Sequence, residues 1–400
     1  MDLPRLRADL ELQIAETQQG PLLLIRDPEV MALDVAQFDA GIVPILKYFD
    51  GTQSLSQIVA DLAKHGATVD EAQLGILVGV LDRALLLDSE HFRTQKAARD
   101  AFAASPLRPA AHAGAAYPVE ATEARAFLDE IVSLADAAPA APLARLIAPH
   151  IDLNLGRDVY AHTTRRLAAG GRPDVVVVLG VNHDFGTHRF VACRKDFETP
   201  LGVVPHDAAF IDALEAELGE DLTAGQFAHH REHSIEFQAL WLAHLWPDDP
   251  PAIVPLLVGS FHEFIETGGT PSADDEVEAF IAALAKTRAA ETRRVLVLAS
   301  VDLAHMGPVY EHDSGLDDAG EAQLERDDRA LLEHVAAGRA EDFFAAVAAD
   351  ENARNVCGTA PVYVALRLGE GPGELVRYGQ GRIHPESGSV VSFATMTFST

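Results

Sequence analysis

Histidines that directly follow apolar runs stand out in this chain as candidates for chemistry. His150 ends the run LIAPH (146–150), His183 lies in VLGVNHDFG (178–186), and Asp302 and His305 lie in LASVDLAHMG (298–307). Each run has the composition of a buried strand, and the carboxyl ends of parallel strands converge on one crevice. A single histidine there is more often a packing or capping residue. Histidines after three separate strands instead indicate a metal pocket, in which imidazole suits iron, copper, zinc or nickel alike.

A cysteine far along the chain is a candidate for the same pocket. Cys357 lies in NVCGTAPVYVALRLG, where Gly358 and Pro361 mark the opening of a helix. A helix N-terminus favours the thiolate, which is the form that binds metal. The alternative is a small buried thiol with no ligand role. The other cysteine, Cys193, lies in a strand-like run and is expected to be structural.

Two further groups are candidates for moving protons. His233 lies in the first turn of a predicted helix within HHREHSIEFQALWLAHLW (229–246), without the two-histidine spacing of a metalloprotease helix. We interpret it as a proton-transfer group or as a partner of a metal ligand. Asp302 precedes His305 by three residues, so its carboxylate is expected to orient that imidazole as a general base.

The elements that must position these residues lie between 111 and 400. Predicted strands cover Leu143–Ala148, Asp174–Gly180, Ala252–Gly259 and Arg294–Ser300, and predicted helices cover Glu120–Ala135, Ala208–Leu218, Ser234–Trp246 and Glu276–Ala290. This alternation predicts an α/β fold, a three-layer sandwich with a mainly parallel central sheet. Glu374–Tyr378 and Ser389–Phe398 are predicted as strands that join the sheet in another direction.

Residues 1–91 form a separate predicted domain, joined to the rest by a linker over 92–110. Strands are predicted at Leu10–Ala15 and Leu22–Ile25, and helices at Val35–Phe49, Leu55–Lys64 and Glu71–Leu85. The run LDVAQFDAGIVPILKYFDGTQSLSQIVADL, followed by LLLD, resembles the PqqD-like family of small winged-helix domains. That resemblance implies peptide binding along an edge strand, often beside a radical SAM enzyme. A purely structural appendage is the alternative.

Charge and composition exclude several classes of partner. The formal net charge of −30 repels polyanions, so nucleic acid and anionic membrane surfaces are not expected partners. The N-terminus lacks a secretion signal and no run is apolar enough to span a bilayer. Only two cysteines occur, which is too few for a disulfide framework. We therefore expect a protein of the reducing cytoplasm.

A set of spaced motifs resembles the Memo family. The motifs are HAGAAYP (112–118), LIAPH (146–150), LGVNH (179–183), EHSIE (232–236), SVDLAH (300–305) and VCG (356–358). The resemblance implies a metal pocket of His150, His183 and Cys357, with Asp302 and His305 beside it. It also implies a fold similar to that of class III extradiol dioxygenases, which use ferrous iron, and a link of the family to copper binding. The bacterial relatives that it implies belong to the AmmeMemoRadiSam system, alongside a radical SAM enzyme.

Three functions agree with this set of residues. The first is a mononuclear iron redox enzyme or oxygenase, in which Fe(2+) has open positions for dioxygen and substrate and His305 moves the proton. The second is zinc-assisted or other metal-assisted hydrolysis, with His233 or His305 as base. The third is a non-catalytic protein that binds metal and peptide.

Overall fold

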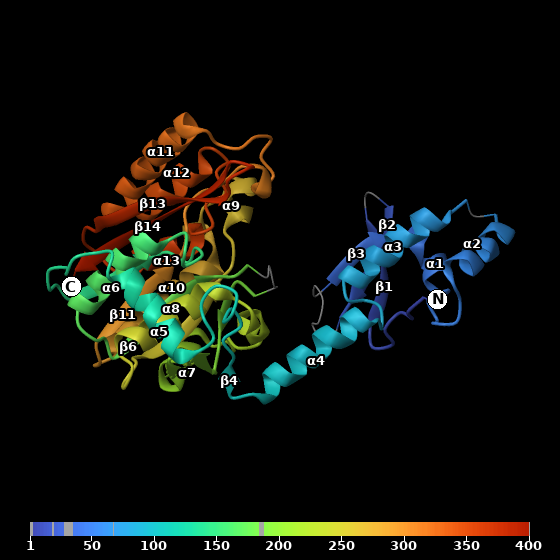
Figure 1. The fold of residues 1–400 in the computed structure, drawn as a ribbon. Helices are drawn as coiled ribbons and strands as arrows, with labels where there is room; N and C mark the ends of the chain where they lie inside the picture. Colours follow the sequence, from blue (N-terminus) through green and yellow to red (C-terminus); the bar gives the residue numbers. More distant parts are fainter. Residues whose placement is uncertain (1–2, 18–19, 28–34, 67, 184–187, 400) are drawn as a thin grey trace. The chain divides into compact units, whose positions relative to one another are not determined.

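The computed structural model describes residues 3–17, 20–27, 35–66, 68–183 and 188–399. The chain divides into two units, Met1–Ala104 and Ser105–Thr400 (Figure 1). Each unit has its own buried apolar cluster among the described residues.

The N-terminal unit combines a three-stranded antiparallel sheet with helices. Its strands are β1 (Glu11–Thr17), β2 (Gly20–Arg26) and β3 (Val35–Asp39), paired in that order. A 3-10 turn, η1 (Ala40–Ile42), leads into α1 (Val43–Leu46), α2 (Leu55–Lys64), α3 (Glu71–Arg83) and α4 (Glu90–Ala104). Capping boxes formed by Ser54 with Gln57 and by Asp70 with Gln73 fix the starts of α2 and α3.

Two predictions for this part of the chain differ from the structure. The predicted helix Val35–Phe49 begins as strand β3, because Ala36 and Phe38 turn toward the core while Gln37 and Asp39 are exposed, and because the segment pairs with β2. The predicted linker 92–110 contains most of α4 and the short strand β4 (Leu107–Arg108). The winged-helix assignment stays a prediction.

The C-terminal unit is built around an eight-stranded sheet of order β12-β14-β5-β11-β6-β10-β7, with β13 paired to β14. The strands are β5 (Leu143–Ala148), β6 (Val175–Val181), β7 (Phe190–Ala192), β10 (Ala252–Val258), β11 (Val295–Ser300), β12 (His305–Met306), β13 (Glu374–His384) and β14 (Ser389–Ser399). β5, β11, β6 and β10 run parallel, and the others pair antiparallel. The sheet is therefore mixed rather than mainly parallel, because the β13–β14 hairpin and the short strands β7 and β12 add antiparallel pairs to the four parallel strands.

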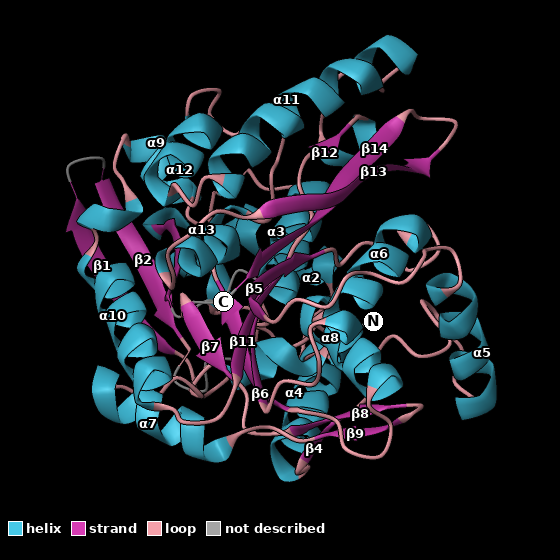
Figure 2. Ribbon diagram, turned by 90° about the vertical axis from the view of Figure 1, so that its left-hand side faces the viewer, coloured by secondary structure: helices cyan, strands magenta, loops and turns pink. Residues whose placement is uncertain are grey.

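Helices cover both faces of this sheet (Figures 1 and 2). They are α5 (Ala121–Val132), α6 (Arg157–Ala169), α7 (Ala208–Leu218), α8 (His233–Leu245), α9 (His262–Thr267), α10 (Asp275–Ala290), α11 (Asp318–Ala336), α12 (Ala340–Ala348) and α13 (Thr359–Arg367). Val175, Val177 and Leu179 of β6 share one buried cluster with α7, α10, α12 and α13. Gly180, on the opposite face of the strand, lies against Ser234 and Ile235 of α8.

A small sheet of β4, β8 (Asp196–Thr199) and β9 (Gly202–Val204) lies beside α8. Among the residues that the structure describes, the remaining elements are short 3-10 helices: η1, η2 (Gln226–His230), η3 (Pro271–Ala273) and η4 (Pro308–Tyr310). Within the described ranges, no helix combines the length and the hydropathy needed to cross a bilayer.

Candidate metal centre

His150 is held at the carboxyl end of β5 with one ring nitrogen free. The residue is 2% exposed, and its backbone N–H donates to Oδ1 of Asp302 over 3.0 Å. Its Nδ1 lies 3.0 Å from the carbonyl oxygen of Ser300, which can only accept, so Nδ1 carries the proton. Nε2 is therefore left with a lone pair directed at the pocket. Burial, with the neighbouring His233 and His183, holds the pKa of His150 well below its ordinary value, so the ring is neutral at pH 7.

His183 is fixed in the same tautomer by a different partner. It follows β6, and its Nδ1 lies 2.9 Å from Oε2 of Glu232, which is the N-cap residue of α8. A carboxylate that accepts from Nδ1 leaves Nε2 free to bind a metal and increases its basicity. The side chain is 39% exposed, so it forms the open side of the cluster.

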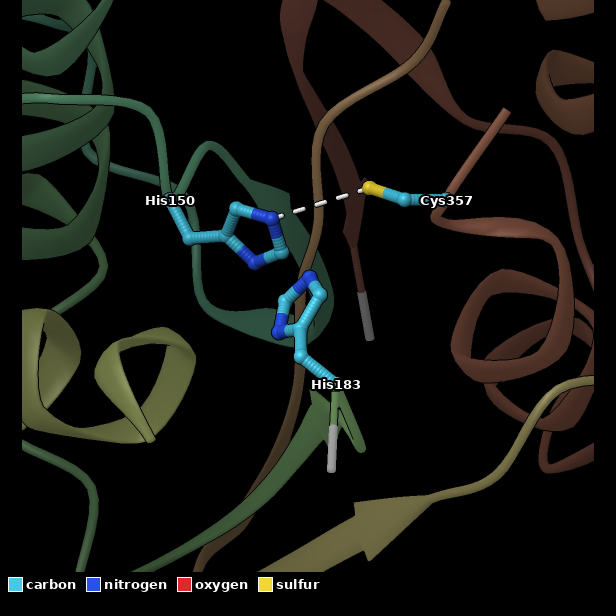
Figure 3. A group of neighbouring side chains, drawn as sticks. All are labelled: His150, His183 and Cys357. Atoms are coloured by element: carbon cyan, nitrogen blue, oxygen red, sulfur yellow. Dashed lines mark hydrogen bonds between the residues drawn. The ribbon is translucent and has the colours of Figure 1, made fainter. Parts of the chain in front are cut away.

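Cys357 completes the cluster from a third segment, just before α13. Its Sγ lies 3.6 Å from Nε2 of His150. One ligand atom each from His150, His183 and Cys357 lies within 4.8 Å of the other two. Figure 3 shows the three side chains pointing toward one another from separate parts of the fold. The structure thus brings together the three residues that we predicted as ligands.

The expected effect of the helix N-terminus on the thiol is wrong for the metal-free protein. Burial, followed by the negative charge of Asp302, raises the pKa of the Cys357 thiol well above its ordinary value. The Sγ atom lies 3.5 Å from the carbonyl oxygen of Asp302, to which the thiol donates. The site therefore holds a protonated thiol, and binding a cation through sulfur would release that proton.

Asp302 does not orient His305, contrary to our expectation. Its Oδ1 accepts from the backbone N–H groups of His150 and Ile151, over 3.0 and 3.1 Å. Nδ1 of His305 instead lies 3.1 Å from the carbonyl oxygen of Leu303 and 3.2 Å from that of Asn355. Asp302 therefore joins the strand ends, while the main chain fixes the imidazole.

Burial changes the pKa values of Asp302 and His305. It raises the pKa of Asp302 to about 7, and it lowers the pKa of His305 to about 4. His305 is consequently neutral at pH 7, and Nε2 is its free acceptor atom.

Glu232 is the functional residue that the sequence analysis missed. It is 6% exposed, it binds His183, and its Oε1 accepts from the backbone N–H of Ser234 over 2.8 Å. Burial opposes its charge, but the hydrogen bond from His183 and, next to it, the backbone N–H of Ser234 hold its pKa well below the usual range. Glu232, His183 and His233 form a second group whose ligand atoms are mutually close. The motif EHSIE contains the signal, since an acidic N-cap faces the same rim as the histidines.

His233 packs beside the cluster. Its ring stacks on His183 with centroids 5.0 Å apart and lies edge-on to His150 at 4.9 Å. Burial lowers its pKa to about 4, so it too is neutral at pH 7. This position agrees with an interpretation as a partner of the ligands.

A cavity of about 610 Å³ opens over the cluster. Its lining includes all the predicted site residues, namely His150, His183, His233, Asp302, His305 and Cys357. Nearby, Glu351, Asn352 and Asn355 adopt positive φ angles of 57°, 55° and 50° in the loop that leads to Cys357. Left-handed backbone in non-glycine residues costs free energy and concentrates at functional sites, which agrees with a loop shaped to present the cysteine.

The first turn of α8 is anchored by a buried ion pair. Arg108 and Glu236 are both fully buried and paired with each other. Glu236 also accepts from the hydroxyl of Tyr117 and, over 2.8 Å, from the backbone N–H of His112. The motif HAGAAYP is thus explained by its attachment to the helix that carries Glu232 and His233.

The sequence model of the Memo-like protein family matches residues 108–397, which is nearly the whole C-terminal unit. This chain belongs to the Memo family. A MEMO1 family protein of Aquifex aeolicus is 27% identical over 360 residues, covering 88% of this chain and 90% of that protein. That match is longer than the C-terminal unit, so it extends into the N-terminal one.

Two further relatives support the same membership. A MEMO1 family protein of Methanopyrus kandleri is 30% identical over 263 residues, which is 63% of this chain and 82% of that protein. One of Thermus thermophilus is 27% identical over 297 residues, which is 72% of this chain and 82% of that protein. The Memo family resemblance is therefore confirmed.

Proposed function

We propose that the Memo unit binds one metal ion, Fe(2+), through Nε2 of His150, Nε2 of His183 and Sγ of Cys357, and that it acts as a redox enzyme or oxygenase. The observation that carries this proposal is the approach of the three ligand atoms to within 4.8 Å of one another. Two imidazoles whose Nδ1 atoms are held by oxygen acceptors, and one ionisable sulfur, fit a divalent transition metal. Copper and zinc suit the same ligands, so the experiment below tests the metal.

The cavity gives such a centre room for a reactant. Three protein ligands leave coordination positions open, and about 610 Å³ lies over them. A ferrous ion held there would supply one-electron chemistry toward dioxygen. The protein orients the ligands through Ser300 and Glu232 and limits water through the buried position of His150.

His305 is the proposed proton acceptor. Its Nδ1 donates to main-chain carbonyl oxygens, so its Nε2 can accept a proton from a hydroxyl group of the substrate. Its pKa of about 4 keeps it unprotonated and available at pH 7. His233, also neutral and in the same cavity, is the second group that can hold or transfer a proton there.

Anaerobic purification followed by metal analysis and oxygen-uptake measurement tests the proposal. We expect iron near one equivalent, lost in Cys357→Ser and kept in Cys193→Ala, because Cys193 is buried outside the cluster. Tight zinc without oxygen uptake would favour metal-assisted hydrolysis. If no metal binds at the cluster, a non-catalytic binding role replaces the proposal.

We also propose that the N-terminal unit binds a peptide along β1. β1 is the edge strand of its sheet, with β2 as its neighbour, and Leu12 and Ile14 are 47% and 54% exposed. An unpaired strand edge with apolar side chains can add a further strand. Pull-down of a radical SAM partner or a peptide by the wild type, but not by a Leu12→Asp, Ile14→Asp double variant, tests this role.

A further inference from the structure

A second cavity of about 320 Å³, here called the side pocket, lies against the candidate metal centre. It is enclosed by the carboxyl ends of β6 and β10, by α9, and by the start of α13. Its apolar lining consists of Val181, Val258, Phe261, Ile265, Val356 and Ala360. The described lining contains no Asp, Glu, Lys or Arg, so the side pocket suits an uncharged group.

Much of the apolar wall of the side pocket is well packed against the core. Phe261 is 1% exposed and contacts the rings of Tyr363 and Phe264 edge-on, with centroids 5.8 and 5.5 Å away. Val356 and Ala360 are each 3% exposed and belong to the main buried cluster of the unit. A preformed apolar pocket costs little reorganisation when it is filled.

Three residues separate the side pocket from the cavity over the metal centre. His183, Asn355 and Cys357 line both spaces. Asn355 is held in place because its carbonyl oxygen accepts from Nδ1 of His305 and its Nδ2 donates to the carbonyl oxygen of Tyr310 over 3.3 Å. The side pocket thus combines its apolar wall with uncharged polar groups, namely Asn182, Ser260, Asn352 and Thr359, and with His262.

We propose that the side pocket binds the apolar substituent of a small molecule whose polar end binds the metal at His150, His183 and Cys357. The proposal rests on the function proposed above and adds a substrate class to it. The polar end is an oxygen chelator, and the substituent is a compact, uncharged aliphatic or aromatic group. The metal ligands then determine where the molecule binds, and the side pocket determines which molecule is selected.

Straight-chain hydroxamates provide the test, because they join an oxygen chelator to an alkyl tail of chosen length. The dissociation constants of acetohydroxamate, butanohydroxamate and hexanohydroxamate are measured on the cobalt-loaded full chain from its visible absorption. Burying one methylene strengthens binding roughly fourfold, so we expect the dissociation constant to fall by about that factor per methylene. A dissociation constant that does not change with tail length would overturn the proposal.

Matched variants test whether the alkyl tail of the hydroxamate lies in the side pocket. Ile265→Asp places a charge in the side pocket and should abolish the dependence on tail length. Ile265→Ala enlarges the pocket mildly and should shift the preference to longer tails. Val309→Asp is the control, because Val309 is 46% exposed and lines only the metal cavity. Loss of the tail effect in Val309→Asp, with retention in Ile265→Asp, would place the substituent elsewhere and refute the proposal.

Xenon binding tests the side pocket independently of the proposed metal centre. Crystals of metal-free protein under xenon pressure should show the gas in the side pocket, since xenon enters preformed apolar cavities. Absence of xenon there would contradict an apolar pocket whether or not cobalt binds. Xenon in the pocket of a protein that fails to bind cobalt would refute the metal centre and leave the apolar site standing.

Discussion

Oε2 of Glu232 lies 2.9 Å from Nδ1 of His183, and this contact fixes which nitrogen of the imidazole faces the candidate metal centre. Glu232 thereby acts on the centre through His183. The same carboxylate caps α8 through Ser234, so helix position and ligand orientation depend on one side chain.

Glu232→Gln should weaken metal binding by about 10- to 100-fold, because the amide keeps the size of the side chain and loses the carboxylate that fixes the orientation of the His183 ring. Titration with Co(2+) measures the change. Glu311→Gln removes an exposed acid from the same cavity and serves as the control. Equal affinities for the Glu232→Gln variant and the wild type would show that the contact has no role in the centre.

Metal affinity should rise about tenfold per pH unit between pH 7.5 and 8.5. In this window the His150 ring is already neutral, whereas the thiol of Cys357, whose pKa is raised by burial, must lose a proton when it binds. Competition with a chelator at several pH values gives the slope. A slope near zero in the wild type would mean that no proton is released on binding, and it would contradict Cys357 as a thiolate ligand.

Asp302→Asn should raise the free energy of unfolding of the metal-free protein, relative to the wild type, more at neutral pH than at acid pH. Burial raises the pKa of Asp302 from 3.8 to about 7, so the folded state favours the protonated acid. Its contribution to stability is present below pH 4 and is lost as pH rises toward 7, by up to about 4 kcal/mol.

The asparagine can keep the acceptor oxygen for His150 and Ile151 and lacks this titration. Urea unfolding of both proteins at pH 4 and pH 7.5, with chelator present, measures the difference. A gap in unfolding free energy that is the same at both pH values would contradict this account of Asp302.

Glu236→Ala should destabilise the Memo unit by about 3–5 kcal/mol, because it leaves the guanidinium of Arg108 buried without its partner. Denaturant unfolding measures the loss. Glu325→Ala removes one side of the surface ion pair between Arg329 and Glu325, whose side chains are 51% and 44% exposed, and should cost less than about 1 kcal/mol. Similar losses for the two variants would mean that burial of the Arg108 pair carries no special cost.

Sequence patterns were sufficient where local chemistry decides the structure. The apolar runs that became β5, β6, β10 and β11 were predicted within about a residue, because short buried strands and amphipathic helices have distinct periods. The same patterns placed His150 and His183 after strands of one sheet.

Local sequence patterns failed where the structure of a segment depends on the strand with which it pairs. The segment at Val35 was predicted to be helical, and β2 makes it a strand. Two C-terminal strands were expected to join the sheet in another direction, and they do, but the further antiparallel pairs formed by β7 and β12, which help to make the sheet mixed, were not predicted.

The sequence by itself determined the candidate ligand types and the strand ends that carry the two histidines. Only the tertiary structure decided that Asp302 holds the main chain of His150 rather than the ring of His305, and that Glu232 orients His183. It also decided that the Cys357 thiol stays protonated. Hydrogen bonds and burial depend on atoms that the fold brings together from distant segments, and spacing along the chain does not encode those distances.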